Sequence, residues 1–128
     1  IKTNKLAIFT FGNISIIDRE KKVIAIKPSG VPYDELTDDK IVILDLDGNI
    51  IEGDLRASSD TKTHLFLYQK WKSINSICHT HSTYAVGWSQ SLNSVPVLGT
   101  THADHLTKEI PCTEPMANSL IKGDCALI

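Results

Sequence analysis

The sequence is poor in the features that mark several large classes of protein. Its 128 residues include only three cysteines, Cys78, Cys112 and Cys125, and this odd set without CxxC spacing does not make a disulfide framework. Reduced thiols in a cytoplasmic protein are the simpler interpretation. No apolar run approaches the roughly 20 residues that cross a bilayer, and the first residues lack the apolar stretch of a secretory signal. We therefore expect a cytoplasmic protein without a membrane segment.

A strong charge of either sign is also missing. The chain has 13 lysines and arginines against 15 aspartates and glutamates, a net charge of -2 at pH 7. This balance argues against a non-specific binder of nucleic acid or of a membrane surface. Aromatic residues make up only 6% of the chain, and they are scattered rather than interleaved with basic residues in one patch. We therefore expect residues such as Phe9, Phe11 and Trp88 in the core or in an interface.

What the chain does contain is a succession of short β-branched runs between turn residues. A helix is expected after Ser58-Ser59-Asp60, where Leu65, Tyr68 and Trp71 recur at three-residue spacing. The other expected elements are strands at 14–18, 23–27, 41–46, 50–52 and 76–81, and helices at 83–92 and 116–122. Strands and helices do not alternate strictly, which favours a single α/β or α+β domain over 1–128 with a largely antiparallel sheet.

The densest chemical motif is His79-Thr80-His81. In a strand, side chains at i and i+2 point to one face, so the two imidazoles suit adjacent positions around one metal ion. Cys78 alternates out of phase with them, which favours a packing role. Two ordinary histidines that happen to alternate are an equally good interpretation of this short motif. The candidates for further ligands are Asp60, His64, His102, Asp104 and His105.

Three small polar turns form a second pattern. Gly12-Asn13, the run 27–30 and the run 58–60 each end a strand or begin a helix. Exposed backbone N–H groups, hydroxyls and the lysine of such turns suit a phosphate. Each turn alone is also ordinary loop chemistry, because Ser, Gly and Asn are the usual turn residues.

Five motifs together resemble those of a known family. They are Thr10–Ser15, Ile26–Val31, Ser58–His64, His79–Ser82 and Gly99–Asp104, in that order. From about residue 6 to residue 116 the chain resembles the class II aldolase and epimerase superfamily, and most closely its epimerase branch. In the fuculose-phosphate type of aldolase, the position of Asp60 is typically a glutamate that acts as acid and base. The resemblance implies an α/β fold of the class II aldolase type, a sandwich with a central, mainly antiparallel sheet flanked by helices.

The resemblance also implies roles for individual residues. Asp60, His79 and His81 match metal ligands, usually of zinc, with manganese as the alternative. Asp104 matches a catalytic acid/base. The positions that match substrate and phosphate binding are Gly12, Asn13, Lys27, Ser29, Gly30, Ser58 and Ser59.

The implied reaction is epimerisation at C4 of L-ribulose 5-phosphate, which gives D-xylulose 5-phosphate. The C3–C4 bond is cleaved in a retro-aldol step, the aldehyde fragment rotates, and aldol addition follows on its other face. A divalent metal serves as Lewis acid, and a phosphate anchor retains the aldehyde. The alternatives are a class II aldolase acting on another phosphosugar, and a non-catalytic relic that binds metal or sugar phosphate.

The resemblance implies a homo-oligomer, a tetramer, with sites between subunits. It also implies that the family's N-terminal helix and C-terminal portion have no counterpart in these residues. That portion carries a third histidine ligand and a tyrosine given by a neighbouring subunit. With three ligands in place of four, we expect weak binding of zinc.

Overall fold

The computed structural model describes residue 1 and residues 3–115 of the chain. The strands are β1 (Asn13–Asp18), β2 (Val23–Ile26), β3 (Val42–Asp45), β4 (Ile50–Glu52) and β5 (Ser76–His79). The helices are α1 (Thr61–Lys70), α2 (Thr83–Gln90) and α3 (Thr100–His105), and η1 (Asp38–Lys40) is a 3-10 turn. Within this part of the chain, no helix is long and apolar enough to cross a membrane.

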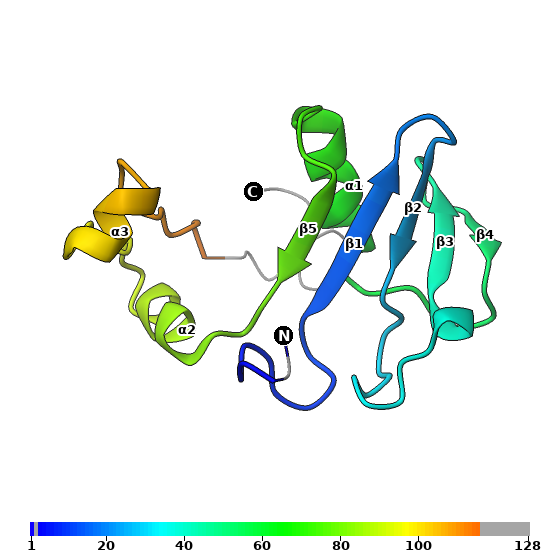
Figure 1. Ribbon diagram of the computed structural model, residues 1–128, viewed down its shortest axis with the longest axis horizontal. Coiled ribbons are helices and arrows are strands. Elements are labelled where there is room, and N and C mark those ends of the chain that lie inside the picture. Colours follow the sequence, from blue (N-terminus) through cyan, green and yellow to red (C-terminus); the bar gives the residue numbers. More distant parts are fainter. Residues whose placement is uncertain (2, 116–128) are drawn as a thin grey trace.

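The strands form one five-stranded sheet in the order β4-β3-β2-β1-β5, and every neighbouring pair is antiparallel. Figure 1 shows α1 against the sheet, and α2 and α3 beyond the end of β5. The predicted fold, an antiparallel sheet with flanking helices, is therefore confirmed. β5 arrives from far along the sequence to pair with β1, and this places Asn13 directly opposite His79.

Alternation along the strands places the core on one face of the sheet. Ile17, Ile24, Ile26, Val42 and Leu44 are buried there together with Leu65 and Tyr68 of α1. The helix spacing predicted for Leu65 and Tyr68 is thus explained by the hydrophobic effect, because both turn toward the sheet. A polar network crosses the same layer: the Ser15 hydroxyl makes hydrogen bonds of 2.7 Å to His64 Nδ1 and 2.8 Å to the Tyr68 hydroxyl. Its buried groups satisfy one another, as burial requires.

Several predicted details were wrong. The strand predicted at 76–81 ends at His79, and α3 begins at Thr100, where no helix was predicted. Cys78 is exposed rather than packed, because it lies on the sheet face opposite the core. Trp71 follows the last residue of α1 and is 57% exposed. The helix predicted at 116–122 lies outside the described residues.

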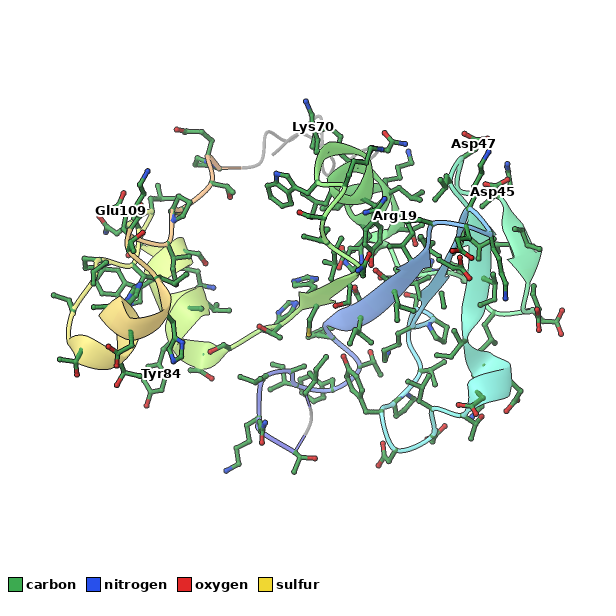
Figure 2. All side chains as sticks on the ribbon, turned by 45° about the horizontal axis from the view of Figure 1, so that its top comes forward. Arg19, Asp45, Asp47, Lys70, Tyr84 and Glu109 are labelled. Atoms are coloured by element: carbon green, nitrogen blue, oxygen red, sulfur yellow. The ribbon has the colours of Figure 1, made fainter. Side chains whose placement is uncertain are left out.

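The segment that carries α2 and α3 packs little against the sheet. None of the residues of these two helices is buried. Figure 2 shows Tyr84 and Glu109 at one end of the molecule, well separated from Asp45 and Asp47 at the far end of the sheet. Any part that this segment plays at the pocket described next is therefore indirect within one chain.

Candidate functional site

A pocket of about 400 Å³ opens where β1 begins, β5 ends and α1 starts. It brings together six of the seven residues predicted to bind substrate and all three predicted metal ligands. Its lining residues are Thr10, Phe11, Gly12, Asn13, Pro28, Ser29, Gly30, Ser58, Ser59, Asp60, His79 and His81. The three polar turns and the three predicted metal ligands come from distant parts of the sequence, and they line the same pocket.

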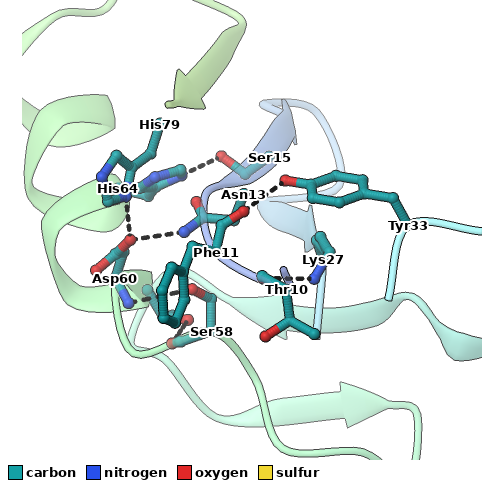
Figure 3. Close-up of polar contacts among 11 residues, drawn as sticks. Thr10, Phe11, Asn13, Ser15, Lys27, Tyr33, Ser58, Asp60, His64 and His79 are labelled. Atoms are coloured by element: carbon teal, nitrogen blue, oxygen red, sulfur yellow. Dashed lines mark hydrogen bonds and ion pairs between the residues drawn. The ribbon is translucent and has the colours of Figure 1, made fainter. Parts of the chain in front are cut away.

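Asp60 occupies the position before α1 but does not cap it. An aspartate at this position usually accepts an N–H of the first helical turn, a contact that contributes about 1 kcal/mol. Here its side chain makes no such bond. Instead, Asp60 Oδ2 accepts His79 Nδ1–H at 2.5 Å and Asn13 Nδ2–H at 2.6 Å (Figure 3). The Asp60 carboxylate therefore binds two side chains of the pocket in place of capping α1, which points to a functional role.

Asn13 connects the sheet to this carboxylate. It is the first residue of β1, its Cα pairs with that of His79, and its side chain is only 4% exposed. Its amide Oδ1 is buried and has no hydrogen-bond partner among the described residues. Buried acceptors are rarely left unpaired. An acceptor of this kind beside an open pocket suits a ligand hydroxyl.

A glycine backbone conformation and side-chain hydrogen bonds hold the polar turns at the pocket. Gly12 has φ +70°, and a Cβ there would lie 2.8 Å from the carbonyl oxygen of His79. Only glycine therefore lets this loop pass so close to the end of β5. Arg56 Nη2 donates to Ser29 Oγ at 3.0 Å, and the Asp60 N–H donates to Ser58 Oγ at 3.2 Å. The N-terminus of α1 adds the positive end of a helix dipole beside Ser58 and Ser59.

Lys27 does not line the pocket but lies beneath two of its loops. Its side chain is 1% exposed. Nζ donates to the carbonyl oxygens of Pro28 at 3.2 Å and Thr10 at 3.4 Å, and it lies 4.8 Å from the centre of the Tyr33 ring. Burial lowers the pKa of Lys27 below its ordinary 10.5. Among the described residues no carboxylate pairs with this ammonium group, so an anion in the pocket would meet a buried positive charge.

The donor chemistry of the three predicted ligands fits a divalent ion. One carboxylate and two imidazoles are donors that zinc and manganese both accept. In the metal-free chain, Asp60 and His79 form a hydrogen-bonded pair and His81 lies beside His79. Asp60 Oδ2 and His79 Nδ1 are 2.5 Å apart, closer than the roughly 3 Å between two ligands of one zinc ion. Within residues 1 and 3–115, no three His, Cys, Asp or Glu side chains stand in a metal-binding arrangement.

The other predicted candidates lie elsewhere. His64 is 2% exposed, and its Nδ1 is bonded to Ser15 in the core. Burial lowers the pKa of His64. His102, Asp104 and His105 lie on α3 and are not among the residues that line the pocket. The catalytic role of Asp104 stays a prediction.

Phe11 was missed as a site residue, since the composition favoured a core or interface position. It is 49% exposed and lines the pocket. The available signal was its place inside the turn motif Thr10–Ser15, directly before Gly12 and Asn13. Thr10 and Pro28 also line the pocket and were not predicted as site residues.

The Asp60–His79 pair makes stability depend on pH. The hydrogen bond from His79 holds the pKa of Asp60 below 3.8, and the same bond raises the pKa of His79 above 6.5. The contribution of Asp60 to folding stability is lost as pH falls below 3.8 through its folded pKa. The contribution of His79 is full below 6.5 and is lost as pH rises through its folded pKa.

We therefore expect the metal-free chain to gain most from the pair at roughly pH 5. A proton NMR titration should place the midpoint of His79 above 6.5, its ordinary value, and the Asp60→Asn variant should lower it. The gain in melting temperature of the wild type over this variant should shrink from pH 5 to pH 9. An unchanged His79 midpoint in the variant would contradict the assignment.

Comparison with known proteins identifies the family. A model described as the class II aldolase and adducin N-terminal domain matches residues 1–126. The proteins named L-ribulose-5-phosphate 4-epimerase UlaF from Salmonella paratyphi C and Salmonella typhi are each 48% identical to this chain over 122 residues. The match covers 95% of this chain and 54% of each relative. The chain therefore spans about half the length of the curated relatives it matches.

Solved structures agree with the fold. A structure titled L-fuculose 1-phosphate aldolase has a TM-score of 0.71 at 38% identity, covering 74% of this chain and 45% of that one. The l-fuculose-1-phosphate aldolase of Thermus thermophilus has a TM-score of 0.75 at 27% identity, covering 90% of this chain and 57% of that one. The resemblance inferred from the five motifs is thus confirmed. The chain belongs to the class II aldolase and adducin N-terminal domain family.

Proposed function

We propose that this chain carries the metal and phosphosugar pocket of an enzyme that epimerises L-ribulose 5-phosphate at C4. The observation that carries the proposal is the meeting of Asp60, His79 and His81 with the phosphate-type turns in one pocket. The aspartate at position 60 favours the epimerase branch over the fuculose-phosphate aldolases. The relatives that are 48% identical bear the epimerase name.

The phosphate is proposed to bind where the turns converge. Ser29, Gly30, Ser58 and Ser59 give hydroxyls and backbone N–H groups on one wall of the pocket. The helix dipole of α1 and the buried ammonium group of Lys27 add positive potential. Because the phosphate stays bound, the aldehyde fragment formed by C3–C4 cleavage is retained while it rotates.

The sugar end is proposed to lie beside the histidines. Asp60, His79 and His81 would hold the divalent ion, which we take to be zinc and which supplies Lewis-acid chemistry for the oxygens of the ketose. The unpaired Asn13 Oδ1 accepts a hydrogen bond from a substrate hydroxyl. Asn13 Nδ2 and the start of α1 keep Asp60 in place.

Asp104 is proposed to move the proton of the C4 hydroxyl as acid and base. It lies on α3, apart from the pocket of its own chain. In this proposal a neighbouring copy completes each site, and we take the working enzyme to be a homotetramer of the cytoplasm.

Product analysis tests the reaction. With Zn²⁺ present, NMR should show L-ribulose 5-phosphate converted to D-xylulose 5-phosphate, the product with the inverted C4 centre. Accumulation of dihydroxyacetone and glycolaldehyde phosphate without the C4 epimer would instead favour an aldolase, the second candidate, which the fuculose aldolase structures support by fold and identity. Formation of neither product with any divalent ion would contradict the catalytic proposal.

Lys27→Gln should weaken phosphate binding, because glutamine keeps hydrogen-bonding ability but removes the buried charge. We expect the dissociation constant of glycolaldehyde phosphate, measured by calorimetry, to rise roughly tenfold or more, since charge-assisted contacts contribute about 1.5–3 kcal/mol. Lys21→Gln is the matched control, because Lys21 is an exposed residue whose 3.9 Å ion pair is with Asp18. Equal affinities in the two variants would show that Lys27 does not contribute to phosphate binding.

A further inference from the structure

The direction of the His81 imidazole is not fixed by the sheet. β5 ends at His79, so the alternation of a strand does not extend to His81. The His81 N–H donates to the carbonyl oxygen of Leu6 at 2.7 Å. That bond holds the main chain but leaves the side chain free to rotate about its own bonds.

Hydrogen bonding does not orient this ring either. Metal-binding histidines are usually held by a hydrogen bond from the ring nitrogen that does not meet the ion. Among the described residues, the His81 ring makes no hydrogen bond, whereas His79 has Asp60. If His81 is to meet the same ion as His79, another contact must orient it.

Phe11 makes that contact. Its ring stacks on the His81 ring with a centroid distance of 5.5 Å and an angle of 29° between the planes. The His81 ring in turn lies 4.9 Å from that of His79, at an angle of 31°. The His81 ring therefore lies in contact with both the Phe11 ring and the His79 ring at the pocket.

The backbone of Phe11 is anchored on both sides. Its N–H donates to the carbonyl oxygen of Ile8 at 3.0 Å, and the Tyr33 hydroxyl donates to its carbonyl oxygen at 3.3 Å (Figure 3). Gly12, the next residue, lies against the end of β5. The ring is nevertheless 49% exposed, so the hydrophobic core does not account for its position.

We propose that Phe11 is a positioning residue that holds the His81 imidazole at its observed 31° tilt to the His79 imidazole, so that both rings can face one bound ion. The orientation is a property of the metal-free chain. Only its consequence for the ion rests on the proposed function. Stacking here takes the place of the hydrogen bond that orients His79.

The first measurement is made without metal, by proton NMR on the 128-residue chain. The carbon-bound protons of His81 should show a ring-current shift that Phe11→Leu removes and Phe11→Trp retains. Phe9→Leu is the matched control, because Phe9 is 80% exposed and meets Phe11 edge-on at 5.9 Å. Unchanged His81 shifts in Phe11→Leu would overturn the proposal. Phe11 is half exposed, so Phe11→Leu should keep the fold, and the amide spectrum checks this.

The second measurement is a titration with Zn²⁺. Phe11→Leu should weaken affinity roughly tenfold or more, the effect typical of losing a group that orients a ligand, while Phe11→Trp should change it little. Altered His81 shifts with unchanged zinc affinity would overturn the functional part of the proposal. A wild type that binds no zinc would instead refute the proposed metal site, and the NMR comparison would still decide whether Phe11 orients His81.

Discussion

Asp60→Asn is expected to weaken Zn²⁺ binding by more than about 100-fold, a larger effect than the 10- to 100-fold typical of residues that only orient a ligand. Asparagine keeps the size of the side chain but removes its charge. It also sets an amide in the place where Asp60 Oδ2 accepts hydrogen bonds from both His79 and Asn13. Competition titration with a chromophoric chelator measures the change.

The matched control is Asp54→Asn, since Asp54 is exposed and lies outside the pocket. It should leave zinc affinity unchanged. A loss of only about 10- to 100-fold in Asp60→Asn would instead mean that Asp60 orients His79 without binding the ion. That outcome would reduce the proposed ligand set to the two histidines.

Gly12→Ala should destabilise the fold by about 2–4 kcal/mol. A left-handed backbone costs a residue with a Cβ about 1–2 kcal/mol, and the φ of Gly12 is +70°. The added Cβ would also meet the His79 carbonyl oxygen at 2.8 Å. This oxygen belongs to β5 and cannot retreat without disturbing the pairing of β5 with β1.

Gly30→Ala is the matched control, because Gly30 has φ +77° but nothing within 4 Å of its added Cβ. It should cost only the backbone term of about 1–2 kcal/mol. Urea unfolding at pH 7 measures both variants. Equal free energies of unfolding for the two would show that the close approach of Gly12 to His79 is not a constraint.

Local pattern was enough to predict most of the sheet. The β-branched runs gave β1 to β4 within a residue or two, because β1, β2 and β3 each bury one face in the core and alternate accordingly, whereas β4 is exposed throughout. The order β4-β3-β2-β1-β5 did not follow from the pattern, because the pairing of β1 with β5 joins segments far apart in the sequence. Cys78 was misjudged because alternation shows which residues share a face but not which face is covered.

The polar residues of the site could be predicted, but the aromatic residues that hold them in place could not. Ser, Gly, Asn, Asp and His carry recognisable chemistry, so the turns and the histidine motif stood out. Phe11 and Tyr33 act through contacts with residues distant in sequence, and no local pattern reveals such contacts. The end of β5 at His79 depends on the start of its antiparallel partner β1 at Asn13, which only the three-dimensional pairing determines.

If Asp60, His79 and His81 bind one divalent ion in the pocket, an NMR titration of the 128-residue chain with Zn²⁺ at pH 7.5 tests this most directly. We expect one saturable event of modest affinity that shifts the ring protons of both histidines and the Asp60 amide together. Saturation that leaves these signals in place and shifts His102 and His105 instead would contradict it.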